Sequence, residues 1–139
     1  MNLIVEHVDV WAARITDDVG ALSAALTSLS KVGANLDFVI GRRSPDRPGE
    51  GVVFVTPLRG DSEVSAAGML GFNITASIDT IRVEGDDDRG AAAAVAEKIA
   101  KAGINVRGFS AAVIGGRFIA FVSFDNRDDA DKAIHVLQN

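Results

Sequence analysis

The sequence predicts an α+β protein made of two βαββαβ units, with antiparallel sheets and the helices on one face. The first observation is an internal repeat: Asp17-Asp18-Val19-Gly20-Ala21 returns seventy positions later as Asp87-Asp88-Arg89-Gly90-Ala91. The second is that Lys31-Val32-Gly33-Ala34-Asn35-Leu36 returns at the same offset as Lys101-Ala102-Gly103-Ile104-Asn105-Val106. A repeat of this length indicates that half of the chain is one folding unit, used twice.

Each half opens with a strand and then a helix. Val8 to Ile15 and Ile78 to Glu84 alternate apolar and polar residues, which is typical of a strand in a sheet covered on one side. The Asp pairs that follow are predicted to supply N-cap oxygens, and Gly33 and Gly103 to adopt the positive φ of a helix C-terminus. Apolar residues at helical spacing predict the buried helix faces: Val19, Leu22, Leu26, Leu29 and Val32 in the first half; Ala92, Val95, Ala96 and Ile99 in the second.

A strand pair and a second helix complete each half. The predicted strands are Leu36 to Arg43 with Gly51 to Leu58, and Val106 to Ile114 with Arg117 to Phe124. The second hairpin turns at Gly115-Gly116 and is the tighter one. The predicted second helices are Asp61 to Leu70 and Asn126 to Leu137, with Asp61 and Asn126 as N-caps.

The last strand of the second unit is expected to come from the N-terminus. Phe72 to Ser77 ends the first repeat, but the chain stops where the copy of that strand would begin, and Asn2 to Glu6 has the matching spacing before Val8. We therefore predict ferredoxin-like repeats at 7–77 and 78–139, the second completed by strand 2–6, which covers an otherwise unpaired edge. The two strand pairs, one in each sheet, are predicted to follow one continuous register, with Asn2 opposite Glu84 and Ile15 opposite Gly71.

Composition and charge exclude several classes of function. The chain has 139 residues, 47% apolar and 24% charged, which fits a globular protein. A net charge of −5 argues against nucleic acid as a partner. No apolar run is long enough to cross a membrane, and the N-terminus does not resemble a signal peptide. The absence of cysteine is compatible with the cytoplasm, where we expect the protein to be.

The repeat resembles the ACT domain, because Asp-x-x-Gly-Ala opens the first helix and Gly-x-Asn-Leu/Val opens the second strand in both halves. The resemblance implies a non-catalytic sensor that binds a small amino acid between paired domains, needs no cofactor, and regulates a partner or oligomer. No enzyme is attached, so the chain resembles a stand-alone tandem ACT protein. The family's ligand-contacting positions fall on Asp17, Asp18, Val19, Gly20, Ala21 and Leu22, and on Asp87, Asp88, Arg89, Gly90, Ala91 and Ala92, with Asn35, Leu36, Asn105 and Val106 facing them.

The chemistry of these positions is consistent with that role, although the sequence departs from the family in places. Helix N-termini offer N–H groups to an α-carboxylate, and Asn or Asp oxygens accept from an α-ammonium. The family often has Pro before the Gly, where Val19 and Arg89 stand here, and Leu two residues after it, where the second half has Ala92.

Other interpretations remain open. The Asp pairs and Asn residues could be caps and turns in a structural or protein–protein interaction module. An acylphosphatase-like enzyme would share the strand order but needs an Arg-containing phosphate loop, and only Arg89 stands in such a loop. Asp86-Asp87-Asp88 and the two isolated His residues fit no calcium or zinc spacing, so we predict no metal. Apolar edge strands containing Ile40, Phe109, Val113 and Ile114 predict a homodimer.

Overall fold

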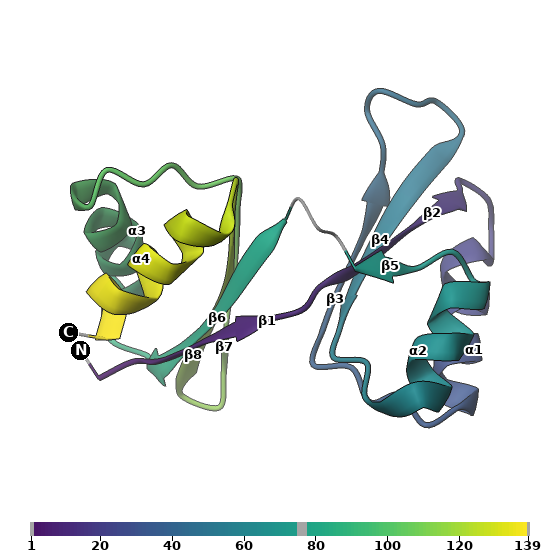
Figure 1. The fold of residues 1–139 in the computed structure, drawn as a ribbon, viewed down its shortest axis with the longest axis horizontal. Helices are drawn as coiled ribbons and strands as arrows, with labels where there is room; N and C mark the ends of the chain where they lie inside the picture. The colour runs from purple at the N-terminus through teal and green to yellow at the C-terminus, as the bar shows by residue number, and fades with distance from the viewer. Residues whose placement is uncertain (1, 75–77, 139) are drawn as a thin grey trace. The chain divides into compact units, whose positions relative to one another are not determined.

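The computed structural model describes residues 2–74 and 78–138 of the chain, and it has the predicted α+β architecture. The chain divides into two compact units. One is formed by residues 9–74, and the other by residues 2–8 together with 78–138 (Figure 1). We call them the first unit and the second unit, after the order of the repeats.

The first unit is a four-stranded antiparallel sheet with two helices. Its elements are β2 (Trp11–Thr16), α1 (Ala21–Lys31), β3 (Phe38–Arg43), β4 (Glu50–Thr56), α2 (Gly60–Met69) and β5 (Asn73–Ile74). The strand order is β3-β4-β2-β5. Only the start of the predicted strand Phe72 to Ser77 is seen as β5, because residues 75–77 lie outside the described part of the chain.

The second unit repeats this arrangement. Its elements are β1 (Ile4–Val8), β6 (Asp79–Asp86), α3 (Ala91–Lys101), β7 (Gly108–Ile114), β8 (Arg117–Phe124) and α4 (Arg127–Gln138). The strand order is β1-β6-β8-β7, with every neighbouring pair antiparallel. The equivalent strands therefore occupy equivalent places in the two sheets.

In each unit both helices lie on one face of the sheet (Figure 1), as the alternating strands predicted. The alternation in β6 places Ile81 and Val83, both fully buried, against α3 and α4, while Arg82 and Glu84 point to the other face and are partly exposed. Helix α3 contributes Val95 and Ile99 to this core. In the first unit the corresponding core is smaller and contains Ala13, Ala25, Leu29, Val53, Val55, Ala67 and Phe72.

The helix C-termini agree with the prediction from glycine. Gly33 and Gly103 have φ of +92° and +77°, which a residue with a side chain adopts only with strain. The amide of each glycine and the amide of the next residue donate to carbonyls of the last helical turn. In the second unit the Gly103 amide donates to Ala100 O at 2.9 Å, and the Ile104 amide donates to Ile99 O at 3.3 Å. This turn ends the helix and directs the chain into the next strand.

The helix N-termini differ from the prediction in α1, α2 and α3 and agree with it in α4. The N-cap residues of α1 and α3 are Gly20 and Gly90 in a left-handed conformation, with no side-chain cap, so the Asp pairs are not N-caps. Asp61 does not cap α2, whose N-cap is Arg59, whereas Asn126 does cap α4 by accepting from the Asp129 amide at 2.8 Å.

The predicted apolar faces also need correction at their ends. Val19 precedes α1 and is fully exposed, and Leu22 and Val32 are exposed by 40% and 37%, because α1 begins only at Ala21 and turns its Ala25–Leu29 side to the sheet. In α3 the buried positions are Ala91, Val95 and Ile99, which leaves Ala92 and Ala96 exposed.

The N-terminal strand pairs with the second unit's sheet, as predicted, but in a different register. Ile4 lies opposite Glu84, two residues along from the predicted partner Asn2. In the first unit Trp11 lies opposite Ile74, which is one residue away from the predicted register and so reverses the faces. The single shared register was wrong because β1 and β2 are separate strands, interrupted at Asp9 and Val10. Two further contacts hold β1: His7 Nε2 lies 2.7 Å from Asp131 Oδ1, and Gln138 Nε2 donates to Val5 O at 3.1 Å.

Strands β3 and β7 lie at the edges of their sheets, which confirms the predicted edge strands. On β7, Phe109, Val113 and Ile114 are exposed by 37%, 52% and 66%. An apolar strand with an unpaired backbone edge is suited to contact with another chain. The repeat boundaries 7–77 and 78–139 stay a prediction.

Candidate functional site

The candidate site is the loop that enters α3. Gly90 has φ of +76° and begins the helix without a side-chain cap in the described chain. The Ala91 amide donates to Asp88 O at 3.0 Å, and the first intrahelical bond runs from the Ala94 amide to Gly90 O. The amides between them, at Ala92 and Ala93, have no acceptor within the helix, because the first turn of any helix lacks one. They are available to an anion.

A cavity of about 310 Å³ opens beside this loop. Its lining includes six of the predicted second-half positions, Asp87, Asp88, Arg89, Gly90, Ala91 and Ala92. The remaining lining comes from the hairpin β7–β8: Ala111, Ala112, Val113 and Phe118. Sequence reasoning missed these four residues, although the run of small residues on a predicted edge strand was a signal for them.

The chemistry around the cavity has two parts. The loop residues Asp87, Asp88 and Arg89 carry ionisable side chains of both signs and stand beside the first amides of α3. The positive end of the α3 dipole favours a carboxylate there. On the strand side the lining is made of alanine, valine and phenylalanine, which favours an apolar group. The arrangement fits a small zwitterion that carries an aliphatic side chain.

The predicted facing residues are not brought to this loop within the unit. Asn105 and Val106 follow the C-terminal end of α3, whereas Gly90 stands at its start. Because α3 has 11 residues, the two ends are about 16 Å apart. In the first unit Asn35 and Leu36 are separated from Gly20 by α1 in the same way. Within one unit, a ligand held at the loop does not also contact the predicted facing residues.

The loop of the first unit has different side-chain contacts. Arg43 Nε on β3 donates to Asp17 Oδ2 at 2.8 Å. The Leu22 side chain packs over Gly41, with its two methyl carbons 3.4 and 3.6 Å from the point where a Cβ on that glycine would lie. The loop is therefore attached to the edge strand by one ion pair and one apolar contact.

Gly20 is needed at this loop for its backbone conformation and not because a side chain there would meet a neighbour. A Cβ built at Gly20 meets nothing within 4 Å, so a valine there would not fill a cavity in this unit. The glycine is required by its φ of +89° instead, which a branched residue adopts only with strain. Loss of binding in a Gly20→Val variant would thus report backbone strain as well as any ligand contact.

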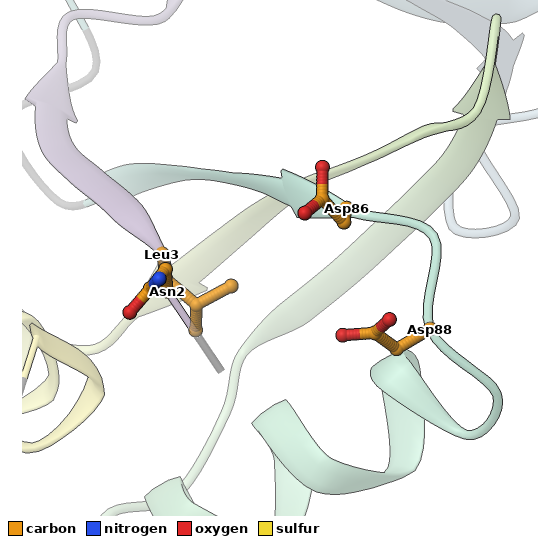
Figure 2. Close-up of a pocket in the computed structure, with 4 residues that line it drawn as sticks. All are labelled: Asn2, Leu3, Asp86 and Asp88. Atoms are coloured by element: carbon orange, nitrogen blue, oxygen red, sulfur yellow. The ribbon is translucent and has the colours of Figure 1, made fainter.

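A second hollow, of about 260 Å³, lies at the start of the β1–β6 ladder and is lined by Asn2, Leu3, Asp86 and Asp88. Figure 2 shows Asn2 and Leu3 on the N-terminal segment, across from the two carboxylates. Asp86 already accepts from Arg117 Nη1 at 2.8 Å, so its charge is compensated within the sheet. Among the described residues no three His, Cys, Asp or Glu side chains converge to hold a metal ion.

The exposed face of the second sheet carries an ion network centred on Glu84. Arg117 Nη2 donates to Glu84 Oε2 at 2.9 Å, and Arg82 Nη2 donates to Glu84 Oε1 at 2.7 Å. These two guanidinium groups, Arg117 first, hold the pKa of Glu84 below its usual range. The same carboxylate raises the pKa of Arg117. The network joins β6 to β8 and lies on the face opposite the helices.

The order of the elements and the two four-stranded sheets define a tandem ACT-like fold, which confirms the fold class that the sequence predicted. The sequence itself matches no protein-family model, and a search of curated proteins finds no match. In the part of the chain that the structure describes, no helix is long and apolar enough to span a membrane.

Solved structures with this fold are similar over nearly the whole chain. Protein BT0572 from Bacteroides thetaiotaomicron is 18% identical, with a TM-score of 0.79, and the match covers 96% of this chain and 88% of that one. The regulatory subunit of aspartate kinase from Thermus thermophilus is 15% identical, with a TM-score of 0.67 and coverage of 99% and 95%. Aspartokinase III of E. coli, in complex with aspartate and ADP, is 10% identical, with a TM-score of 0.56 and coverage of 97% and 32%. At these identities the similarity is one of fold.

Proposed function

We propose that the protein is a non-catalytic sensor that binds a small amino acid at the loop entering α3 and passes the change to a partner or oligomer. The observation that carries the proposal is the cavity of about 310 Å³ between this loop and β7, where a helix N-terminus, Arg89 and two carboxylates meet an apolar wall. Its volume is at the lower end of the range of about 300–1,000 Å³ for small-molecule sites.

The proposed binding mode assigns each part of the ligand to a partner. The α-carboxylate accepts hydrogen bonds from the Ala92 and Ala93 amides and lies near the positive end of the α3 dipole. Arg89 adds a positive charge at the same loop. The α-ammonium donates to the carboxylates of Asp87 and Asp88, and the side chain packs on β7.

The known proteins with this fold support a regulatory role. One of these solved structures is described as the regulatory subunit of aspartate kinase, and aspartokinase III was solved in complex with aspartate and ADP. We carry over the general role from these structures and not their ligand or enzyme. The binding of an amino acid to this chain is our proposal.

We further propose that a second copy of the chain supplies the facing half of the site. Gly90 stands at the start of α3 and Asn105 beyond its end, and the two ends of the helix are about 16 Å apart, so Asn105 does not reach a ligand held at its own loop. The exposed side chains Phe109, Val113 and Ile114 on β7 give a second copy an apolar edge to pack against. Pairing along that edge would join the cavity of one chain to Asn105 and Val106 of the other.

The test is isothermal titration of the full chain against each of the twenty amino acids, with thermal unfolding as the second readout. A ligand at a hundredfold excess over Kd should stabilise the protein by about 2.7 kcal/mol, which is visible as a raised midpoint. Asn105→Ala should weaken binding by roughly 1–3 kcal/mol if its amide contacts the ligand. Asn73→Ala is the matched control, because that amide is exposed and donates to Gly71 O of the same turn at 3.3 Å. No heat and no shift with any amino acid would refute the sensor.

Light scattering tests the second copy. We expect a dimer at micromolar concentration, and Ile114→Lys to shift it toward the monomer, because it places a charge on the apolar edge strand at a residue that does not line the cavity. A wild-type protein that is monomeric and still binds its ligand would refute the shared site. If the protein is dimeric but binds none of the amino acids, the apolar β7 edge favours the alternative function, an interaction module without a ligand.

A further inference from the structure

The two repeats have the same loop backbone. The Asp17 amide donates to Gly49 O at 2.9 Å, and the Asp87 amide donates to Gly116 O at 3.0 Å. The loops then turn into their helices through glycines with φ of +89° and +76°. The side chains around the two loops differ more than these backbone features do.

In the first unit those side chains close the gap between the loop and the edge strand. Leu22 lies over Gly41 of β3, so that a Cβ on the glycine would be in contact with both Leu22 methyl carbons. Arg43, two residues further on β3, donates to Asp17 at 2.8 Å. Leu22 therefore lies between the loop and β3, and one of the two loop carboxylates, Asp17, is paired with Arg43.

In the second unit the corresponding positions are Ala92, Ala111 and Val113. A leucine facing a glycine has become an alanine facing an alanine, which removes three carbon atoms from the helix side and adds one to the strand side. The arginine has become a valine, which cannot donate to Asp87. All three replacements line the cavity of about 310 Å³.

From this pattern we infer that only the second unit's loop binds ligand, and that Ala92, Ala111 and Val113 select an amino acid with an aliphatic side chain. The inference rests on the proposed function and adds to it which loop is occupied and which class of ligand it takes. The hollow beside Ala92 and Ala111 holds the aliphatic group, next to Val113 and Phe118. The first loop, closed by Leu22 and Arg43, is a structural copy.

Titration of the full chain gives the first test. We expect one ligand per chain, with alanine, valine, leucine and isoleucine among the binders, and serine, aspartate and lysine binding at least tenfold more weakly than the best of them. Two equivalent ligands per chain would overturn the inference, because the first loop would then be open. A preference for a charged or polar side chain would overturn it as well.

Two variants rebuild the closed loop in the second unit. Ala92→Leu restores the leucine and Val113→Arg restores the arginine opposite Asp87, so each should raise Kd at least tenfold. Ala96→Leu is the matched control, since it makes the same change at an exposed position one turn further along α3, and its Kd should equal that of the wild type. Ala92 is itself exposed and leucine is a good helix former, so the Ala92→Leu protein should keep its melting temperature.

The outcomes separate the inference from the function on which it rests. Wild-type affinity in both Ala92→Leu and Val113→Arg would overturn the inference while leaving the sensor in place at another site. Absence of binding of every amino acid to the wild type would overturn the sensor and this inference with it. Tenfold weaker binding in both variants, with the Ala96→Leu control unchanged, would support both.

Discussion

Truncation of Val5 to alanine tests whether the N-terminal strand belongs to the second unit. Val5 is 6% exposed and packs in the core formed by β6, β8, α3 and α4, although more than seventy residues separate it from them in the sequence. It pairs with Val83 across the β1–β6 ladder. The change keeps the backbone of β1 intact, because alanine needs no other conformation.

The expected loss follows from the groups removed. Two methyl groups at about 0.8 kcal/mol each give about 1.6 kcal/mol of lost burial, and the cavity left behind adds to this. We expect the free energy of unfolding of the second unit to fall by about 2 kcal/mol. With a urea dependence of about 1–3 kcal/mol per molar, its midpoint should drop by about 1 M. Ile4→Ala is the control, since Ile4 is 57% exposed, and it should change stability by less than about 0.5 kcal/mol.

Hydrogen exchange followed by mass spectrometry gives the location of the loss. Peptides from residues 78–138 should exchange faster in the Val5→Ala protein, because the opening free energy of that core is reduced. The reasoning is refuted if the faster exchange appears in peptides from residues 9–74, or if Val5→Ala and Ile4→Ala have the same stability. Either result would mean that β1 is not part of the second sheet in solution.

Three further predictions concern individual side chains. Glu84→Gln should destabilise the protein at pH 7, because the ionised carboxylate is lost from its two arginine partners. The native pKa of Glu84 lies below the unfolded value of about 4.3, so the stabilisation is complete above the unfolded pKa and is lost as the pH falls through the native pKa. Urea unfolding from pH 7 to pH 2.5 should therefore show the difference from wild type disappearing in acid. Asn126→Ala should cost about 1 kcal/mol through the lost N-cap, whereas Asp61→Ala, which caps nothing, should cost less than about 0.5 kcal/mol; equal losses would contradict this assignment. Gly68→Ala should raise stability by about 0.5–1 kcal/mol, because the site is helical, exposed and free of contacts, while Gly103→Ala should lower it because φ there is +77°; thermal melts that move both variants in the same direction would show the argument to be wrong.

Much of the fold could be read from local sequence features. The seventy-residue repeat predicts two units, because each turn and cap depends on residues close together in the chain. Gly33 and Gly103 end their helices as expected, since positive φ is a local property that glycine alone adopts readily. Edge strands β3 and β7 followed from the strand order of the unit, and the N-terminal strand followed from the spacing that left one strand missing.

Other features depended on contacts between residues far apart in the sequence. The register of β1 on β6 places Val5 beside Val83 in the core, and residue spacing along the sequence does not determine this packing. The Asp pairs had the composition of N-caps, but the left-handed glycines after them start the helices instead.

The candidate site shows the same division. The sequence determined which loops repeat, and it marked Ala92 as a departure from the leucine that the family often has at this position. Only the tertiary structure places Leu22 over Gly41 and Arg43 beside Asp17, and leaves a cavity where Ala92 faces β7. The physical reason is that the effect of a small residue at the helix start depends on the side chains that face it from the edge strand. Those side chains are brought to the loop only when the sheet forms.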